Sequence, residues 1–315
     1  MNFASIGLNA ARINLPGYTN FGLQKTNNMS NRKTWFITGA SKGLGLSLVK
    51  QLLKAGNNVA ATSRSIAGLH KAIGENIEGF LPLAVELTSE ESVNTAVTSA
   101  IDKFGSIDVV VNNAGYGLAG SLEELTDKEA RTNFDINVFG ALNVIRSVMP
   151  HLRKQGSGHI FNIASIGGFT GNFPGFGIYC ATKFAMHGFT ESLAAEVKAF
   201  GIHTTIVSPG YFRTNFLEPD SLVVPKNEIR EYKEVREIQR IHQDEINGNQ
   251  EGDPDKAALA MIRVAEDKNP PLHLFLGKDA YQLAYQKMES VTSELKKWES
   301  VGTATSFEQA QPAIA

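Results

Sequence analysis

Short apolar runs and helical repeats alternate along most of this chain. Nearly continuous apolar runs predict strands at 35–37, 58–62, 80–85, 107–111, 159–164, 202–207 and 272–276. Between them, apolar residues that recur every three or four positions predict helices over 44–54, 89–103, 123–153, 179–200, 253–267 and 279–299. Strands that alternate with helices through short connections are typical of an α/β protein. We therefore predict a single-domain, Rossmann-type doubly wound parallel sheet, whose ligands bind beyond the carboxyl ends of its strands.

A change of pattern after Thr214 marks an insertion into this fold. A charged helical run lies between Pro225 and Gly248, and we place the insertion at about 215–252, near the substrate cleft. A long insertion beside a binding face is either a lid over the substrate or a solvated amphipathic helix. We expect one catalytic domain over 34–300 that contains this insertion.

The two ends of the chain lie outside the predicted domain. Residues 1–33 contain no acidic side chain and carry Arg12, Lys25 and Arg32, a composition that transit peptides share. We interpret this segment as a flexible N-terminal extension, with translation from Met29 as the alternative. Residues 301–315 are predicted to form a C-terminal tail.

The first strand runs into a glycine-rich turn and then into a helix. Gly39, Gly43 and Gly45 follow the apolar run, and the helical repeat begins at Leu44. At such a helix start, unpaired N–H groups and the helix dipole attract anions, and glycines let a pyrophosphate approach the backbone. The turn predicts dinucleotide binding, although a plain βα connection would also contain glycines.

The residues after the second strand indicate which dinucleotide is preferred. Folds that bind NAD usually place Asp or Glu about 20 residues beyond the glycines, where it holds the ribose 2′-hydroxyl. This chain has Ser63 and Arg64 there, and Lys42 lies within the glycine turn. Two cations without a carboxylate favour a 2′-phosphate, so we predict NADP(H), with NAD(H) possible. The alternative is that Arg64 is only a solvated surface charge.

Composition excludes several other classes of protein. Hydrophobic residues make up 42% of the chain and charged residues 20%, and the formal net charge of −2 gives no sign of a nucleic-acid partner. No apolar run is long enough to cross a membrane. The single cysteine, Cys180, cannot form an intramolecular disulfide and suits a small core residue in a cytoplasmic protein. The histidines show no metal-binding spacing, so we predict no metal.

Tyr179 and Lys183 are candidates for acid–base chemistry. They stand four positions apart at the start of a predicted helix, so their side chains share one face. A free tyrosine has a pKa near 10, and a lysine cation one turn away is expected to lower the pKa of Tyr179 towards neutrality. Alone, such a pair is common on helix surfaces, but here it accompanies a nucleotide-binding turn.

Taken together, these motifs resemble the short-chain dehydrogenase/reductase family over most of 34–276. The resemblance is carried by Thr38-Gly39-x-x-x-Gly43-x-Gly45, Asn112 to Gly115, Asn137, Ser165, Tyr179-x-x-x-Lys183, and Pro209-Gly210 followed by Thr214. Glu86 departs from the aspartate that the family commonly has there. Within the family, the runs 113–117 and 208–214 are similar to those of hydroxysteroid and retinol dehydrogenase-like enzymes.

The resemblance implies a role for each matching residue. Tyr179 is the expected general acid/base, Ser165 binds the substrate oxygen, Lys183 holds the nicotinamide ribose, and Asn137 orders a proton-relay water. The residues expected to bind the cofactor are Gly39, Ser41, Lys42, Gly43, Leu44, Gly45, Arg64, Glu86, Leu87, Asn113, Ala114, Gly115, Tyr179, Lys183, Pro209, Gly210 and Thr214.

The predicted activity is the NADP(H)-dependent interconversion of a secondary alcohol and a ketone or aldehyde by hydride transfer. Phe169, Phe173 and Phe176 either line an apolar substrate pocket or pack their own loop. A nucleotide-sensing regulatory protein and an epimerase or dehydratase that uses bound cofactor transiently are the alternative functions. Related enzymes pair through the helices that correspond to 123–153 and 179–200, so the resemblance implies a homodimer or homotetramer.

Overall fold

The computed structural model describes residues 32–307. The predicted extension, apart from its last two residues, and the alternative start at Met29 lie outside this range. So do residues 308–315 of the predicted tail. Everything below concerns the unit that begins at Arg32.

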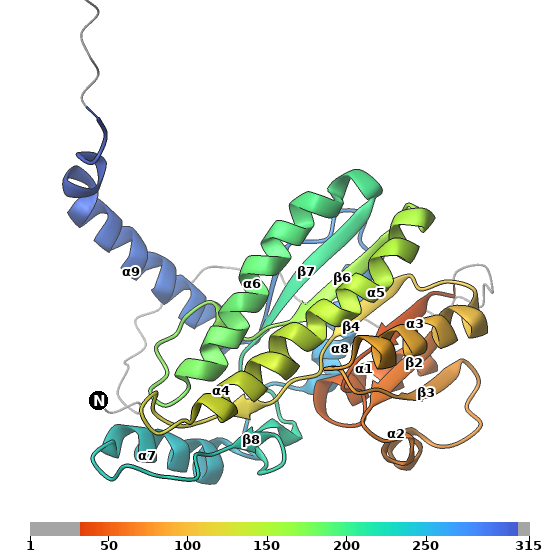
Figure 1. The fold of residues 1–315 in the computed structure, drawn as a ribbon, viewed down its shortest axis with the longest axis horizontal. Coiled ribbons are helices and arrows are strands. Elements are labelled where there is room, and N and C mark those ends of the chain that lie inside the picture. The colour runs from red at the N-terminus through yellow and green to blue at the C-terminus, as the bar shows by residue number, and fades with distance from the viewer. Residues whose placement is uncertain (1–31, 308–315) are drawn as a thin grey trace, which may run out of the picture. The chain divides into compact units, whose positions relative to one another are not determined.

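Seven parallel strands form the central sheet, as the alternation of the sequence predicts (Figure 1). They run in the order β3-β2-β1-β4-β6-β7-β9, so the strand order reverses between β1 and β4. The strands are β1 (Thr34–Ile37), β2 (Asn58–Ser63), β3 (Phe80–Ala84), β4 (Val109–Asn112), β6 (Gly158–Ile163), β7 (Ile202–Pro209) and β9 (His273–Leu276).

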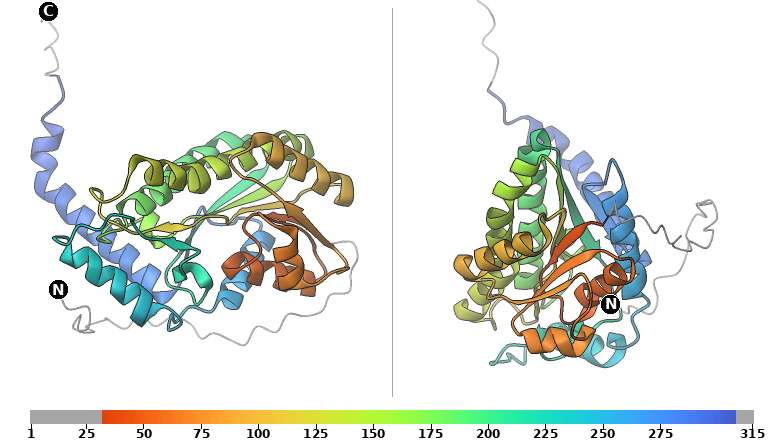
Figure 2. Two further views of the ribbon diagram at one scale, coloured as in Figure 1. Left: turned by 60° about the horizontal axis from the view of Figure 1, so that its bottom comes forward. Right: turned by 90° about the vertical axis from the view of Figure 1, so that its right-hand side faces the viewer.

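Helices cover both faces of this sheet, which makes it doubly wound (Figure 2). One face carries α1 (Gly43–Lys54), α2 (Ile66–Ile73) and α8 (Pro254–Glu266), whereas the other carries α3 (Glu90–Phe104), α5 (Gly140–Gln155) and α6 (Gly177–Val197). Side chains alternate across β1, so Trp35 and Ile37 lie in the first core and Phe36 in the second. The long helix α9 (Lys278–Thr303) follows β9.

Two helical predictions need correction. The repeat over 123–153 begins later than predicted and contains a π-helical turn. Thr126 caps its start: the Thr126 hydroxyl accepts from the amide of Glu129, and the Glu129 carboxylate accepts from the amide of Thr126. The segment is α4 (Asp127–Phe134), a π-helical turn (Asp135–Phe139) and α5. The sequence analysis also missed α2, a short helix in which only Leu69 is buried.

The insertion is more varied than the single helical run that its charges predict. It contains a 3-10 turn (Asn215–Leu217), the short strand β8 (Leu222–Val223), α7 (Lys233–Arg240) and a π-helical segment (Ile241–Ile246). β8 pairs in parallel with β5 (Gly117–Leu118), which follows closely on the end of β4. This pairing attaches the insertion to the carboxyl edge of the main sheet.

Candidate active site

A cavity of about 540 Å³ lies at the carboxyl ends of the central strands. It is within the size range of small-molecule and cofactor sites. Of the predicted site residues, only Gly45 and Asn137 do not line it. Those that do are Gly39, Ser41, Lys42, Gly43, Leu44, Arg64, Glu86, Leu87, Asn113, Ala114, Gly115, Ser165, Tyr179, Lys183, Pro209, Gly210 and Thr214.

The glycine turn fits tightly against the end of β4. Gly39 has φ +65°, and a Cβ there would lie 2.7 Å from the Cα of Ala114. At Gly45 a Cβ would lie 2.5 Å from the side-chain nitrogen (Nδ2) of Asn113 and 2.7 Å from the Gly39 carbonyl oxygen. Gly45 therefore serves close packing of α1 and does not face the cavity.

Thr38 and Asn113 hold this junction in place through hydrogen bonds. The Thr38 hydroxyl accepts from the amides of Asn113 and Ala114 at 3.0 Å each. The Asn113 side chain donates to the carbonyls of Thr38 and Gly39 at 2.9 and 3.0 Å. These bonds pair the backbone polar groups of the turn with side chains of the same junction. The start of α1 is therefore fixed beside the cavity.

Lys42 and Arg64 both line the cavity, as the prediction of a phosphate site requires. Lys42 Nζ lies 2.7 Å from a carboxylate oxygen of Asp220, a residue of the insertion that the sequence analysis did not select. Hydrogen bonding and charge from Lys42, with a smaller contribution from Arg64, lower the pKa of Asp220. Lys42 is therefore already paired with a carboxylate of the insertion.

Tyr179, Ser165 and Lys183 converge on the same part of the cavity. Tyr179 and Lys183 are both buried in the first turns of α6, and Lys183 Nζ lies 5.8 Å from the centre of the Tyr179 ring. Lys183 donates to the carbonyl of Ile163 at 2.8 Å. Ser165 lies just beyond the end of β6, and its hydroxyl accepts from the amide of Gly167 at 3.0 Å.

The expected lowering of the tyrosine pKa does not hold in this structure. Burial raises the pKa of Tyr179 above its ordinary value, and a hydrogen bond with Ser165 only partly opposes the rise. Burial also lowers the pKa of Lys183 to about 7. The loss of water around both side chains, which the spacing of Tyr179 and Lys183 does not reveal, is the largest cause of both shifts in pKa.

Asn137 lies in the π-helical turn, and hydrogen bonds within the chain use its side chain. Its oxygen accepts from the amide of Tyr116 at 3.0 Å, and its nitrogen donates to the Tyr116 carbonyl at 3.0 Å and to Thr182 at 3.1 Å. A Cβ built on Gly115 would lie 3.0 Å from the Asn137 oxygen and 3.6 Å from Lys183 Nζ. Asn137 and Lys183 therefore flank the same glycine.

The loop that contains Phe169, Phe173 and Phe176 is predicted either to line the pocket or to pack on itself, and each alternative holds for part of it. Phe173 and Phe176 line the cavity, whereas Phe169 packs in a cluster with Ala280 and Ala284 of α9. Cys180 is buried, and burial raises its pKa to about 11, which disfavours the reactive thiolate. The insertion completes the wall with residues that carry no sequence motif: Phe216, Leu217, Val223, His242 and Gln250.

One further group of potential ligands lies away from the cavity. Atoms of His187, Glu191 and His273 that could bind a metal all lie within 4.8 Å of one another. His187 Nε2 instead shares a hydrogen bond with the hydroxyl of Ser208 at 3.1 Å, and His273 lies 3.8 Å from Glu191.

Within 32–307, no helix is long and apolar enough to span a membrane.

A family model described as short chain dehydrogenase matches residues 33–222, more than half of the chain. The chain belongs to this family. It is accordingly an oxidoreductase that acts on CH–OH or C=O groups, and its fold and nucleotide-binding cavity are those of a short-chain dehydrogenase.

Relatives at moderate identity cover nearly the whole dehydrogenase. Oxidoreductase BOA17 of Botryotinia fuckeliana is 35% identical over 87% of this chain and 99% of its own. A 3-ketodihydrosphingosine reductase of Bacteroides thetaiotaomicron is 36% identical over 81% of this chain and 91% of its own. The solved structure of a short-chain dehydrogenase from Streptomyces avermitilis is 35% identical, with a TM-score of 0.81 over 88% of this chain and all of its own.

Solved members of the family contain either nicotinamide cofactor. ElxO, 30% identical with a TM-score of 0.64 over 78% of this chain and 97% of its own, has NADP bound. A 3-ketoacyl-(acyl-carrier-protein) reductase from Brucella melitensis is complexed with NADH. It is 27% identical, with a TM-score of 0.64 over 77% of this chain and 96% of its own. These neighbours support a nicotinamide cofactor for this dehydrogenase without selecting NAD or NADP.

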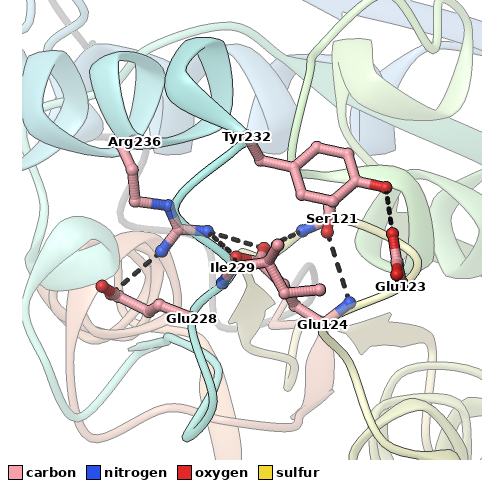
Figure 3. A network of polar contacts seen from close by, with 7 residues as sticks. All are labelled: Ser121, Glu123, Glu124, Glu228, Ile229, Tyr232 and Arg236. Carbon is pink, nitrogen blue, oxygen red and sulfur yellow. Dashed lines mark hydrogen bonds and ion pairs between the residues drawn. The ribbon is translucent and has the colours of Figure 1, made fainter.

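A buried ion pair fastens the insertion of this dehydrogenase beside its cavity (Figure 3). The Arg236 guanidinium, on α7, donates to both carboxylate oxygens of Glu124 at 2.6 Å, and the Glu124 side chain is 0% exposed. Glu124 also accepts from the amides of Ser121 and Ile229 at 2.7 Å each. Hydrogen bonding and the nearby guanidinium outweigh burial and lower the pKa of Glu124.

Replacing Arg236 with methionine is expected to loosen the insertion while the sheet stays folded. The Glu124 carboxylate would lose its charged partner and keep only its hydrogen bonds from Ser121 and Ile229, so the local stability should fall by about 2 kcal/mol. Hydrogen exchange at the Ile229 amide should then be roughly thirtyfold faster. Arg240→Met on the same helix, which removes only exposed ion pairs, is the matched control. Equal exchange rates in the two variants would show that the buried pair does not hold the insertion.

Proposed function

We propose that this dehydrogenase interconverts a secondary alcohol and a ketone or aldehyde with NADP(H), and that Tyr179 is its general acid/base. The observation that supports this proposal is the meeting of two features in one cavity. The glycine turn at Gly39 and Gly43 forms one part of the wall, and Tyr179 with Ser165 forms another. A nucleotide that lies along the turn can therefore place its reactive ring beside an ionisable hydroxyl.

The residues supply what carbonyl reduction needs. When bound, the nicotinamide supplies the hydride for reduction and accepts it for oxidation. Negative charge that develops on the substrate oxygen requires a proton and hydrogen bonds. Tyr179 donates the proton, and Ser165 holds the same oxygen by a hydrogen bond. In the direction of oxidation, Tyr179 takes the proton back from the alcohol.

Lys183 and Asn137 support this proton transfer. Burial lowers the pKa of Lys183 to about 7, so its proton is mobile near neutral pH. Lys183 would hold the nicotinamide ribose, and a charge there opposes the rise that burial causes in the pKa of Tyr179. Because Asn137 and Lys183 flank Gly115, a relay water between them would connect Lys183 with the solvent.

The remaining predicted residues fit the rest of the cofactor. Pro209, the last residue of β7, would hold the carboxamide together with Gly210 and Thr214. Asn113, Ala114 and Gly115 would line the adenosine side. Leu87 faces the cavity beside Glu86. The Glu86 carboxylate instead accepts hydrogen bonds from the hydroxyl and amide of Thr88 at 2.8 and 3.3 Å. Glu86 would therefore hold its own loop in shape beside the adenine.

The preference for NADP(H) rests on the charges beyond the glycine turn. Arg64 and Lys42 line the cavity, and the neighbouring positions Thr62 and Ser63 carry no charge. The ion pair of Lys42 with the Asp220 carboxylate, at 2.7 Å, supports an affinity of this corner for negative charge. A 2′-phosphate would compete with Asp220 for Lys42 and would bring two negative charges towards Arg64.

An apolar or mixed substrate suits the part of the cavity beyond Tyr179. Phe173, Phe176 and Phe216 supply apolar walls, and a hydrogen-bonded pair, the Tyr211 hydroxyl and His242 Nε2 at 2.9 Å, supplies one polar patch. We place the enzyme in the hydroxysteroid and retinol dehydrogenase-like branch on this basis. The name of the Bacteroides relative also denotes a ketone reductase.

A homodimer or homotetramer through α5 and α6 is part of the proposal. Phe139, which immediately precedes α5, is 51% exposed, and Phe184 on α6 is 43% exposed. Large aromatic side chains on neighbouring helices are common at interfaces between subunits.

Oxidation of NADPH and NADH with a panel of aliphatic, steroid and retinoid carbonyl compounds tests the proposed activity. Faster oxidation of NADPH, in equal amount to the alcohol formed, supports the proposal. An epimerase or dehydratase would convert substrate without net consumption of cofactor. A sensing protein would bind NADPH without turning over any member of the panel.

A further inference from the structure

The last helix of the fold has an unusually exposed apolar surface. Seven of the sixteen exposed large hydrophobic side chains among residues 32–307 belong to α9: Tyr281, Tyr285, Met288, Val291, Leu295, Trp298 and Val301. Leu295 is 67% exposed and Trp298 is 58% exposed. Contiguous apolar surface of this kind marks an interaction site more often than a solvated face.

Only the first two turns of α9 are packed against the rest of the fold. Ala280 and Ala284 are buried in a cluster with Ile166, and Phe169 and Phe275 pack around them. From Met288 to Phe307 every residue is exposed. Figures 1 and 2 show this part of α9 extending away from the sheet and its helices.

The apolar positions of α9 repeat every seven residues. Tyr281, Met288 and Leu295 occupy one position of the heptad, and Ala284, Val291 and Trp298 occupy the position three residues later. This is the a/d pattern by which two helices pack along a common seam. Gly302, seven residues after Leu295, ends the pattern near the C-terminus of the helix.

We propose that this face of α9 binds the α9 of a second copy of the chain, and that the two helices run antiparallel. With Met288 opposite Val291 of the second copy, Tyr281, which is 49% exposed, lies opposite Trp298. Ala284 stays packed in its own fold, so the seam runs over the exposed side chains that follow it. Two-fold symmetry repeats each of these contacts, as a closed homodimeric interface requires. Exposed large side chains are thereby matched to each other along the seam.

The charges beside the seam select this arrangement. In the same register, Lys287 lies opposite Glu294 of the second copy, and Lys278 lies opposite Glu299, so each flank carries pairs of opposite charge. Among residues 32–307, none of these four side chains is in an ion pair. A parallel pair in register would instead bring Glu294 beside Glu299 of the second copy. Charges at these flanking positions decide the partner and its direction.

The charge balance of α9 also favours a protein partner over a membrane surface. Helices that lie on anionic membranes usually carry an excess of lysine and arginine on the polar face. In α9 the basic and acidic residues are equal in number: Lys278, Lys287, Lys296 and Lys297 against Asp279, Glu289, Glu294 and Glu299.

Sedimentation of the full-length chain over a dilution series tests the proposed contact. The double variant Leu295→Glu/Trp298→Glu is expected to reduce the mass of the assembly by half, because it places charges in the seam. Ser293→Glu, on the opposite face of α9, is the matched control and should leave the mass unchanged. Since α9 lies outside the cavity, activity per chain should stay the same in both variants. An unchanged mass in the double variant would overturn the proposal.

Charge reversal tests the direction of the two helices. Glu294→Lys should weaken the association by about tenfold, because it faces Lys287 of the second copy in both symmetry-related positions. Adding Lys287→Glu should restore the original association, since each pair is then reversed. A stronger association of the single variant would indicate parallel helices and contradict the proposal.

Tryptophan fluorescence separates a second copy from other partners of this face. Trp35 is buried, so a change of emission with protein concentration reports on Trp298. A shift to shorter wavelength as the concentration rises is expected. A shift only with vesicles of phosphatidylcholine and phosphatidylserine, or a monomer whose Trp298 emission changes only when residues 1–31 are deleted, would overturn the proposal.

Discussion

Tyr179→Phe is expected to lower kcat by roughly a thousandfold and to change the Kd for NADPH by less than about twofold. The large effect follows from the loss of the proposed proton donor, since positioned acid–base groups typically contribute two to four orders of magnitude. The small effect follows because, in the proposed complex, the glycine turn and the cations beyond it bind most of the cofactor. Stopped-flow hydride transfer and fluorescence titration with NADPH measure the two quantities.

Tyr211→Phe is a suitable control for that substitution. Tyr211 also lines the cavity and loses the same atom, but its hydroxyl is engaged with His242. We expect it to retain turnover within about tenfold of the parent. If both variants lost activity equally, a general disturbance of the cavity would explain the result. If Tyr179→Phe kept the parent rate, another group would have to supply the proton.

Arg64→Asp is expected to reduce the ratio of kcat/KM for NADPH to that for NADH by roughly a hundredfold. The substitution removes a charge-assisted hydrogen bond to the 2′-phosphate and places a like charge near it. It also supplies a carboxylate that can accept hydrogen bonds from the ribose hydroxyls of NAD. Arg64 is exposed, so the fold should not suffer.

Two further variants make this test specific. Arg131→Asp removes an exposed cation outside the cavity, which is paired with Asp127, and should leave the cofactor ratio unchanged. Asp220→Asn removes the carboxylate at Lys42 and should lower KM for NADPH a few-fold while KM for NADH stays constant. An unaltered ratio in Arg64→Asp would mean that Arg64 does not read the phosphate.

The features predicted correctly from the sequence are those encoded within short stretches of it. Apolar runs such as 35–37 predict buried strands, because parallel strands are covered on both faces. The glycine turn and the Tyr179–Lys183 pair depend on spacing within one turn or one helix. The structure places both around a single cavity.

The mistakes arose where a neighbouring contact decided the outcome. Thr126 starts α4 later than the apolar repeat suggests, because a capping box satisfies the first amides. The pKa of Tyr179 rises because α6 is buried in the fold, and the charge of the nearby lysine does not offset that burial.

The sequence by itself determined the fold, the family and the position of the glycine turn, because each depends on local periodicity or fixed spacing. The tertiary structure alone decided that Asp220 meets Lys42 across 178 positions of sequence and that Arg236 meets Glu124 across 112. It also decided that Ala284 is buried while Leu295, on the same helix face, is exposed. Such contacts depend on which segments the sheet brings together. The spacing of residues within one segment does not predict which other segment it will contact.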